Sequence, residues 1–247
     1  DGISTQLMVG KNHKIKTIKQ YNRPNSLGLF YALITEYCGF VKDNDEFKLM
    51  GLSSYGDKYR FNFDWLLKSN SGDYCLNTNY IKALQPNSPS PHKQIPLYND
   101  IFTKKMQKEP RNPSSKIDQF YIDVAASAQN HFENIITDLI KKFYMENGIS
   151  RICLAGGCAL NVIANKKIRE IGFLDQVYIQ PASNDSGIAL GAAYMMSSEL
   201  GYRINPLKDV YYGPKYNNEY IHRVLKRNQT NFKEVEDPCF EAAKLVA

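Results

Sequence analysis

Residues 151–200 repeat one order twice: a short apolar run, a loop of small residues and a segment suited to a helix. The first run, "RICLA", is predicted to form a short buried strand, and residues 159–171 the helix after it. The second run, "QVYIQ", is predicted to form another strand, followed by the loop "PASND" and a helix of small residues, "SGIALGAAYMMSSEL". A β-α-β-α succession is typical of α/β folds, so this segment predicts an α/β core.

Two segments nearer the start of the chain also carry a clear periodicity. Apolar and polar residues alternate on either side of "GKNHK", which predicts a β-hairpin with strands near residues 4–9 and 15–21. In "NSLGLFYALITEYCGF" the apolar residues recur at helical spacing. We expect Asn25 or Ser26 to cap this helix and Gly39 to end it.

The remaining segments define the organisation of the chain. A long helix is predicted from about residue 118 to 146, because apolar residues recur there every three or four positions and an Asn-Gly pair follows. The stretch "KLMGLSSYGDKYR" is predicted to be a shaped loop, and "QPNSPSPHKQIP" an exposed one. Prolines after Gly201 mark a linker, so the predicted domains are residues 1–205 and 206–247.

The composition excludes several classes of protein. With 247 residues, 43% of them hydrophobic, the chain suits one large or two modest globular domains. No apolar stretch approaches the roughly 20 residues that span a bilayer, so no membrane partner is expected. The net charge is +6, but the lysines lack interleaved arginine and aromatic residues, so a solvated surface explains them better than nucleic-acid binding.

The cysteines and histidines bear on location and on metal binding. Five cysteines, an odd number without a CxxC pair, predict reduced thiols in a reducing compartment, the cytoplasm. The four histidines are scattered, so this chain alone offers no complete metal site. The chain begins with Asp-Gly and no methionine, which predicts a piece of a longer polypeptide.

The loops after the two predicted strands are the candidate ligand site, because α/β sheets bind ligands at the carboxyl ends of their strands. Gly156 and Gly157 would let a ligand approach the backbone, where N–H groups at the start of a helix favour an anion. Asn161, expected one turn into that helix, would bond a phosphate or a ribose. Asp185, in the second loop, is expected at a helix N-terminus, where negative charge is favoured.

Each loop also has a purely structural explanation. A pair of glycines after a strand is often only a turn, and this pair belongs to neither a GxGxxG nor a Walker motif. An aspartate before a helix is most often an N-cap, which would explain Asp185. Asn165 is expected to lie on the helix surface or to bond the neighbouring loop. Only the pairing of the two loops in adjacent β-α units supports a nucleotide-type site.

The stretch "KLMGLSSYG" is a third candidate. Lys48 would reach a phosphate, and Gly51 and Gly56 would permit a close approach of the backbone. The alternative is a solvated lysine beside a turn. Three further polar residues are expected to pack in the core rather than to bind a ligand: Tyr31, Thr35 and Gln129.

Several motifs together resemble one family, the carbamoyltransferases of the nodulation and antibiotic-tailoring type. They run nearly end to end: "DGISTQ", "NSLGLFYALITEYCGF", "FKLMGLSSYG", "PRNPSS", "DVAASAQ", "LAGGCALNVIANKKI", "VYIQPASNDSGIALGAAY" and "VYYGPKYNNEYI". The resemblance implies a fold similar to the tRNA threonylcarbamoyladenosine synthesis protein Kae1, in the actin/hexokinase/Hsp70 superfamily. This Kae1-like domain would be incomplete at its N-terminus, and residues 206–247 would begin a YrdC-like C-terminal domain.

The resemblance also implies roles for individual residues. Asp185 matches an aspartate that helps to hold a divalent metal, iron or alternatively magnesium, beside the nucleotide phosphates. The GGxxxN loop of the family and its KxMGL stretch lie near the nucleotide. The positions that match them are Gly156, Gly157, Asn161, Lys48 and Gly51.

The implied activity is an ATP-dependent O-carbamoyltransferase. Carbamoyl phosphate and ATP would give carbamoyl-adenylate, whose carbamoyl carbon a hydroxyl of a small-molecule or glycan acceptor would attack. The histidine-rich metal motif of the family and most of its C-terminal domain are absent here, so this chain by itself is expected to be inactive. Two alternatives stay open: a sugar-kinase-like phosphotransferase of the same superfamily, and a nucleotide-binding protein without catalysis.

Overall fold

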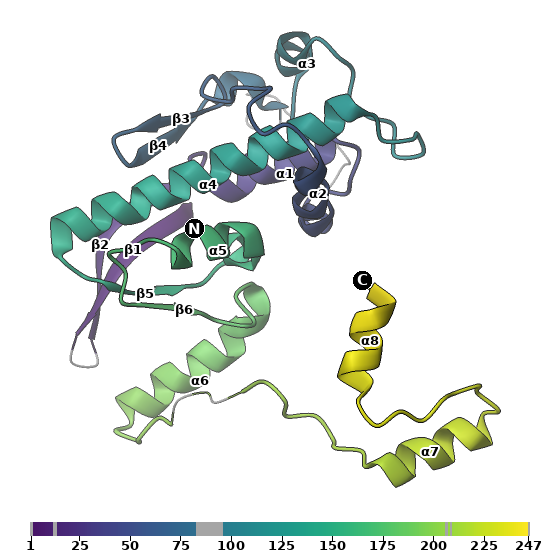
Figure 1. Cartoon of the computed structure of the whole chain (residues 1–247). Helices are drawn as coiled ribbons and strands as arrows, with labels where there is room; N and C mark the ends of the chain where they lie inside the picture. The colour runs from purple at the N-terminus through teal and green to yellow at the C-terminus, as the bar shows by residue number, and fades with distance from the viewer. Residues whose placement is uncertain (1, 12–13, 83–95, 206, 208, 247) are drawn as a thin grey trace. The chain divides into compact units, whose positions relative to one another are not determined.

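The computed structural model describes residues 2–11, 14–82, 96–205, 207 and 209–246 (Figure 1). The chain divides into two units, Asp1–Ile204 and Asn205–Ala247, which are described separately. The predicted exposed loop "QPNSPSPHKQIP" lies almost wholly outside the described residues.

The first elements of the larger unit are the predicted hairpin and helix. Strands β1 (Ile3–Lys11) and β2 (Lys14–Asn22) pair antiparallel, which confirms the hairpin. Helix α1 (Leu27–Tyr37) follows, and the Ser26 hydroxyl caps it by accepting a bond from the Leu29 amide at 3.1 Å. Gly39, with φ +77°, comes directly after its C-cap, so the predicted end of the helix is also confirmed.

Helix α4 (Gln119–Asn147) is the long predicted helix, and it forms the centre of the core. The Asp118 carboxylate caps its start, and Gly148 ends it with φ +65°. Its apolar stripe packs against α1, where the rings of Tyr31 and Phe132 meet edge to face at 5.4 Å. Burying each such aromatic side chain stabilises the fold by about 1.5–3 kcal/mol.

Residues 48–55 of the stretch predicted as a shaped loop are helical, so the prediction was wrong there, and only residues 56–60 form a loop. Residues of "KLMGLSSYG" form the end of α2 (Glu46–Leu52) and the 3₁₀ helix η1 (Ser53–Tyr55). The fully buried Leu49 anchors α2 in the core, and this packing outweighs the cost of about 1 kcal/mol for a glycine inside a helix. Of the two glycines in this stretch, Gly56 is the one that close packing requires, because a Cβ there would lie 2.4 Å from the Ile122 carbonyl oxygen of α4.

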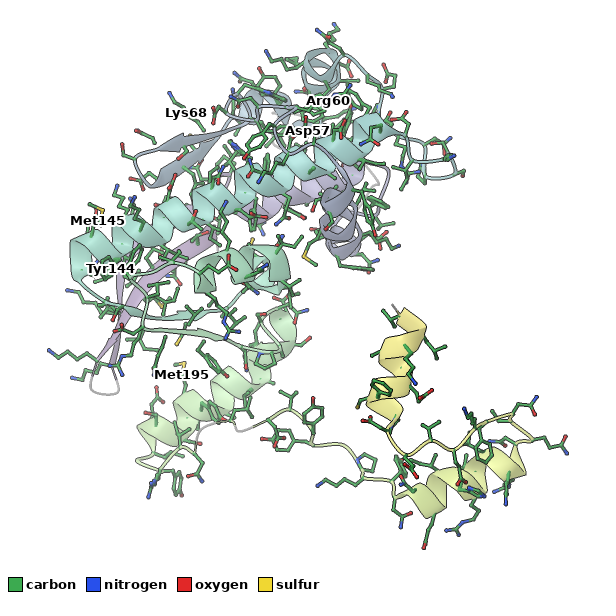
Figure 2. The ribbon with its side chains drawn as sticks, viewed as in Figure 1. Asp57, Arg60, Lys68, Tyr144, Met145 and Met195 are labelled. Carbon is green, nitrogen blue, oxygen red and sulfur yellow. The ribbon has the colours of Figure 1, made fainter. Side chains whose placement is uncertain are left out.

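The segment after η1, which carries Asp57 and Arg60 (Figure 2), is bonded to buried polar groups of α4. The Asp123 carboxylate accepts bonds from the Asp57 amide at 2.8 Å and from the Arg60 guanidinium at 2.6 Å. The Ser127 hydroxyl donates to the Asp57 carbonyl and accepts from the Phe61 amide. The helix α4 therefore carries polar as well as apolar anchors on its buried side.

A second hairpin and a short helix complete this part of the core. Strands β3 (Leu67–Asn70) and β4 (Asp73–Leu76) pair antiparallel, and η2 (Thr78–Tyr80) and α3 (Asp100–Met106) follow. The Asp73 carboxylate accepts bonds from Lys142 on α4 and from Lys19 and Tyr21 on β2. These bonds hold the pKa of Asp73 well below its usual value and join three elements.

The predicted β-α-β-α succession is present in the structure. Strands β5 (Arg151–Leu154) and β6 (Gln176–Ile179) pair in parallel. The short η4 (Gly157–Leu160) and α5 (Val162–Arg169) connect them, and η5 (Asp185–Gly187) and α6 (Ile188–Glu199) follow. The chain is therefore a mixed α/β protein, as predicted, and its actin/hexokinase-like arrangement stays a prediction.

The prediction that β5 is buried was wrong. Ile152 and Leu154 are half-buried, whereas Arg151 and Cys153, on the opposite face of the strand, are exposed. The residues of β6 alternate in the same way between exposed and half-buried, and α6 has no buried residue. Parallel sheets are usually covered on both faces, and the described elements cover only one face of this pair.

The smaller unit contains α7 (Asn218–Arg227) and α8 (Pro238–Val246). The Asn217 side chain caps α7 by accepting a bond from the Tyr220 amide at 2.9 Å. None of its described residues is buried. That it begins a YrdC-like domain stays a prediction. Across both units, none of the described helices is long and apolar enough to cross a membrane.

Candidate functional site

The structure brings the two predicted ligand loops together. The amide of Gly156, after β5, donates a hydrogen bond of 2.6 Å to the carbonyl of Ser183, after β6. Because the two strands are parallel, their carboxyl ends meet at one edge, where α/β proteins bind ligands. Residues 155–161 and 181–187 are called the two-loop junction below.

The two glycines of the junction have open space beside them. Gly156 has φ +98°, a backbone conformation that favours glycine. A Cβ built on Gly156 or Gly157 would meet no heavy atom within 4 Å. Packing among the described residues therefore does not explain why glycine stands at 157, and none of them blocks the approach of a ligand to the backbone there.

Asp185 lies at a helix N-terminus, as predicted, but it is not the N-cap. Asn184 is the cap, since its side chain accepts a bond from the Ser186 amide, so the structural explanation offered for Asp185 was wrong. The Asp185 side chain is exposed and has no hydrogen-bond or ion-pair partner among the described residues. Its turn requires Gly187, because a Cβ there would lie 2.2 Å from the Ala182 carbonyl oxygen.

The described residues do not make a metal centre by themselves. Within the described ranges, no group of three or more histidine, cysteine, aspartate or glutamate side chains is placed to hold a metal ion. One carboxylate supplies a single ligand, whereas protein metal sites use several. The assignment of Asp185 as a metal ligand therefore stays a prediction.

Asn161 is the N-cap of α5, not a residue one turn into the helix as predicted. The preceding residues form η4, so α5 begins only at Val162. The Asn161 Oδ1 accepts a bond from the Ala164 amide at 2.9 Å. Its amide also pairs in both directions with that of Gln129 on α4, at 2.8 and 2.9 Å. A direct contact between Asn161 and a nucleotide stays a prediction.

The polar residues that were expected in the core are found there. Gln129 is buried and accepts a bond of 2.7 Å from the Tyr31 hydroxyl, and Thr35 donates to the Tyr31 carbonyl. Asn165 is buried and donates to the Ala159 carbonyl of η4 at 2.7 Å, so the expectation that it lies on the helix surface was wrong. The pairing of Gln129 with Asn161 leaves no local pattern in the sequence and was not predicted.

Lys48 and Gly51 lie on α2, apart from these contacts. The Lys48 ammonium is 2.9 Å from the Asp45 carboxylate, and about half of the lysine side chain (47%) is exposed. No hydrogen bond or ion pair among the described residues joins Lys48 to the two-loop junction. Gly51 is exposed, and a Cβ there would meet nothing within 4 Å. Their nucleotide-binding role stays a prediction.

Cys158 lies inside the junction but is not suited to nucleophilic chemistry. Its sulfur is 3.7 Å from the position of a Cβ built on Gly28, so η4 packs against the start of α1. Burial raises the pKa of the Cys158 thiol to about 11. The thiol therefore stays protonated near neutral pH, and the thiolate is the reactive form of cysteine.

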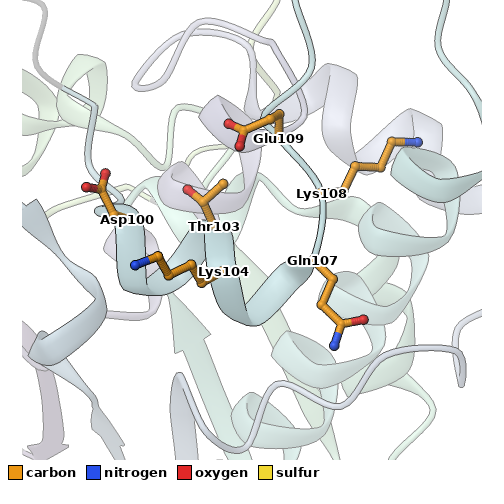
Figure 3. Close-up of a pocket in the computed structure, with 6 residues that line it drawn as sticks. All are labelled: Asp100, Thr103, Lys104, Gln107, Lys108 and Glu109. Carbon is orange, nitrogen blue, oxygen red and sulfur yellow. The ribbon is translucent and has the colours of Figure 1, made fainter.

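A shallow surface pocket of about 470 Å³ lies elsewhere, on α3 and the turn after it (Figure 3). No predicted site residue lines it, and its walls are mostly charged side chains in open solvent. It is not the candidate site. Its lining residues are Asp100, Thr103, Lys104, Gln107, Lys108 and Glu109.

Comparison with known proteins identifies the family. Residues 2–194 match the family described as "Carbamoyltransferase N-terminus". Nodulation protein NolO of Bradyrhizobium diazoefficiens is 37% identical over 230 residues, which cover 89% of this chain and 37% of the relative. Nodulation protein NolNO of Sinorhizobium fredii is 33% identical over 219 residues, covering 87% of this chain and 29% of the relative.

A third relative extends the comparison beyond the nodulation proteins. The protein sll1178 of Synechocystis is 33% identical over 232 residues, which cover 90% of this chain and 36% of the relative. The chain thus spans about a third of the length of these relatives. Since the family match extends over most of its residues, the chain belongs to the carbamoyltransferase family, in the region described as its N-terminus.

Proposed function

We propose that this chain supplies the nucleotide-binding part of an ATP-dependent O-carbamoyltransferase. Carbamoyl phosphate, ATP and water would give carbamoyl-adenylate, phosphate and pyrophosphate. A hydroxyl of a small-molecule or glycan acceptor would then attack the carbamoyl carbon, lose its proton and expel AMP. Membership of the carbamoyltransferase family and the similarity to NolO support the carbamoyl chemistry.

The observation that supports nucleotide binding is the open backbone of the two-loop junction. Among the described residues, the amides of Gly157 and Cys158 have no hydrogen-bond acceptor, and no side chain stands over Gly157. Backbone N–H groups without acceptors after a glycine turn suit phosphate oxygens. The bond from Gly156 to Ser183 would keep this turn next to Asp185.

The other predicted residues have supporting roles in this proposal. Asp185 would donate one carboxylate oxygen to a divalent metal, iron or magnesium, whose further ligands would come from outside the described residues. Such a metal, when bound, polarises the carbamoyl group and stabilises negative charge. Lys48, beside Gly51 on α2, would exchange the carboxylate of Asp45 for a nucleotide phosphate.

The place of this chain in a larger protein is part of the same proposal. Residues 206–247 would begin the YrdC-like domain that makes carbamoyl-adenylate, and the Kae1-like unit would carry out the transfer. The protein would act in the cytoplasm, where its five free cysteines stay reduced.

The test is Gly157→Asp in the protein encoded by the complete gene. The new carboxylate would stand in open space, so the fold should persist, but it would repel a phosphate. ATP affinity, measured by calorimetry, should fall at least tenfold, which is about 1.4 kcal/mol. Gly172→Asp is the matched control: it adds the same charge at an exposed, open glycine beyond the other end of α5.

The products distinguish the proposed function from its alternatives. With carbamoyl phosphate and an acceptor, a carbamoyltransferase of this kind releases AMP and pyrophosphate. A sugar-kinase-like enzyme would instead release ADP, and a nucleotide-binding protein without catalysis would release neither. Equal ATP affinity in the wild type and a folded Gly157→Asp variant would remove the junction from the nucleotide site.

A further inference from the structure

The side chain of Gln129 has no unused hydrogen-bonding group. Its Nε2 donates to Glu133 Oε1 at 2.8 Å and to Asn161 Oδ1 at 2.9 Å. Its Oε1 accepts from the Tyr31 hydroxyl at 2.7 Å and from Asn161 Nδ2 at 2.8 Å. Two donors and two acceptor positions are all that a glutamine amide has. Tyr31, Gln129 and Asn161 are called the polar triangle below.

Asn161 also spends most of its side-chain groups on bonds inside the chain. Its Oδ1 accepts from both the Ala164 amide and Gln129, and one Nδ2 hydrogen goes to Gln129. Three of the four hydrogen-bonding positions of the Asn161 side-chain amide are therefore taken up inside the chain.

The orientation of each amide is imposed by its neighbour. Glu133 presents a carboxylate, which only accepts, so the Gln129 Nε2 must face it and Oε1 must face Tyr31. Gln129 then requires Asn161 to present Oδ1 and Nδ2 as observed. A flipped Asn161 amide would point its NH₂ group at the NH₂ of Gln129 and at the Ala164 amide.

The hydrogen bonds from Tyr31 through Gln129 to Asn161 connect to the backbone of the two-loop junction. Through its side chain, Asn161 caps α5, and through its own N–H it bonds the Cys158 carbonyl at 3.2 Å. Tyr31, Gln129 and Asn161 are each no more than 8% exposed, so water does not compete for these bonds. The triangle thus joins α1 and α4 to the loop that carries Gly156 and Gly157.

We propose that Gln129 is a positioning residue of the nucleotide loop, which acts through Asn161. Phosphate would be held by the backbone that Asn161 fixes. This inference rests on the proposed function, because it assigns how that same site is organised.

The experiment is a double-mutant cycle on ATP affinity in the protein from the complete gene. Gln129→Met fills similar space without hydrogen bonds, and Asn161→Ser keeps a good N-cap but loses the amide pair. Each single variant should weaken ATP binding about tenfold. The double variant should also lose about tenfold and no more, because both changes break the same connection.

Two results in the cycle would overturn the proposal. If Gln129→Met keeps wild-type ATP affinity while Asn161→Ser loses it, Asn161 is a direct ligand. If the two losses multiply in the double variant, the residues act independently. Ser127→Ala is the matched control, because it removes a buried polar group of α4 that bonds residues 57–61 and not the junction. It should lower the melting temperature and leave ATP affinity unchanged.

Amide hydrogen exchange, measured without ATP, tests the positioning role of Gln129 independently of the proposed carbamoyltransferase function. In the ligand-free protein, Gln129→Met should speed amide hydrogen exchange at Ala164 and along the junction, and Ser127→Ala should not. Unchanged exchange would overturn the positioning role even if ATP binds. A wild type that fails to bind ATP would refute the proposed function, and exchange would still decide the role of Gln129. If Gln129→Met does not fold, Tyr31→Phe, which removes one hydroxyl, replaces it in both measurements.

Discussion

Asp185 and Asp100 occupy equivalent places at the residue scale, although only one of them lies at the candidate site. Each follows an asparagine that caps a short helix: Asn184 bonds the Ser186 amide, and Asn99 bonds the amides of Ile101 and Phe102. Both aspartates are exposed first residues of their helices. If Asp185 has a functional role, a substitution at Asp185 must therefore change activity or metal binding, and the same substitution at Asp100 must not.

Changing Asp185 to Asn should abolish function without affecting stability. The change removes an anionic metal ligand but disturbs no cap and no ion pair among the described residues. Bound metal and AMP release should fall by orders of magnitude in the protein from the complete gene, with an unchanged melting temperature. Asp100→Asn should alter neither metal content nor activity. Wild-type metal content in Asp185→Asn would return this aspartate to a surface role.

At the scale of elements, Asp123 is a buried carboxylate with which α4 holds the segment after η1. Burial raises the pKa of Asp123. Three partners outweigh this effect and hold the pKa of Asp123 below its usual value: the Asp57 amide and Gln119 donate hydrogen bonds, and Arg60 adds both a hydrogen bond and its positive charge. The carboxylate is almost fully buried, with 3% of its side chain exposed. Folding therefore favours the charged form of this group.

This lowered pKa predicts a loss of stability in acid. As the pH falls through about 4, the unfolded chain takes up a proton at Asp123 before the folded protein does, so the stability supplied by this group declines. Asp123→Asn should be less stable than wild type at pH 6 and should lose less on acidification to pH 3, as read by melting temperature. Asp100→Asn, which removes the same charge from an exposed side chain at the start of α3, is the matched control. Parallel curves for Asp123→Asn and wild type would contradict the assignment.

Arg111 joins the end of α1 to the segment before α4, and it has no carboxylate partner among the described residues. Within that part of the chain, its buried guanidinium donates to backbone carbonyls alone, and a lysine, with one point of charge, cannot reach all of them. Arg111→Lys should lower the free energy of unfolding by about 3 kcal/mol, measured with denaturant. Arg151→Lys, on the exposed face of β5, should have no effect on stability, and equal stability of the two variants would contradict this role of Arg111. The acceptors are the carbonyls of Cys38, Gly39, Asn112, Pro113 and Ser115.

The elements that the sequence predicted are those whose signals are local. Ser26 and Gly148 lie at the helix ends that they set, so α1 and α4 were found with nearly correct bounds. The helix α2 was missed because Gly51 favours a loop. The helix is stabilised by burial of Leu49 against residues that are distant in the sequence. At the site, the glycine loops were predictable, whereas the bond between Gln129 and Asn161 joins residues 32 positions apart and leaves no local pattern.

At the scale of the whole molecule, the two units differ in what holds them together. All buried residues of the described chain lie in Asp1–Ile204, around α1 and α4. The described contacts inside Asn205–Ala247 are surface contacts, such as the stacked rings of Tyr216 and Tyr220 and the pair His222–Glu234. Exposed contacts of this kind contribute little to stability.

The smaller unit is therefore not expected to fold alone. Its helices have 10 and 9 residues, and isolated helices shorter than about 12–15 residues are marginal in water. A synthetic peptide of residues 205–247 should show little helix by circular dichroism and no cooperative melting. Trifluoroethanol should induce helix in the same peptide, since Asn217 and the basic last turn of α7 favour it locally. Cooperative melting of the peptide in plain buffer would instead show that residues 205–247 are an independent domain.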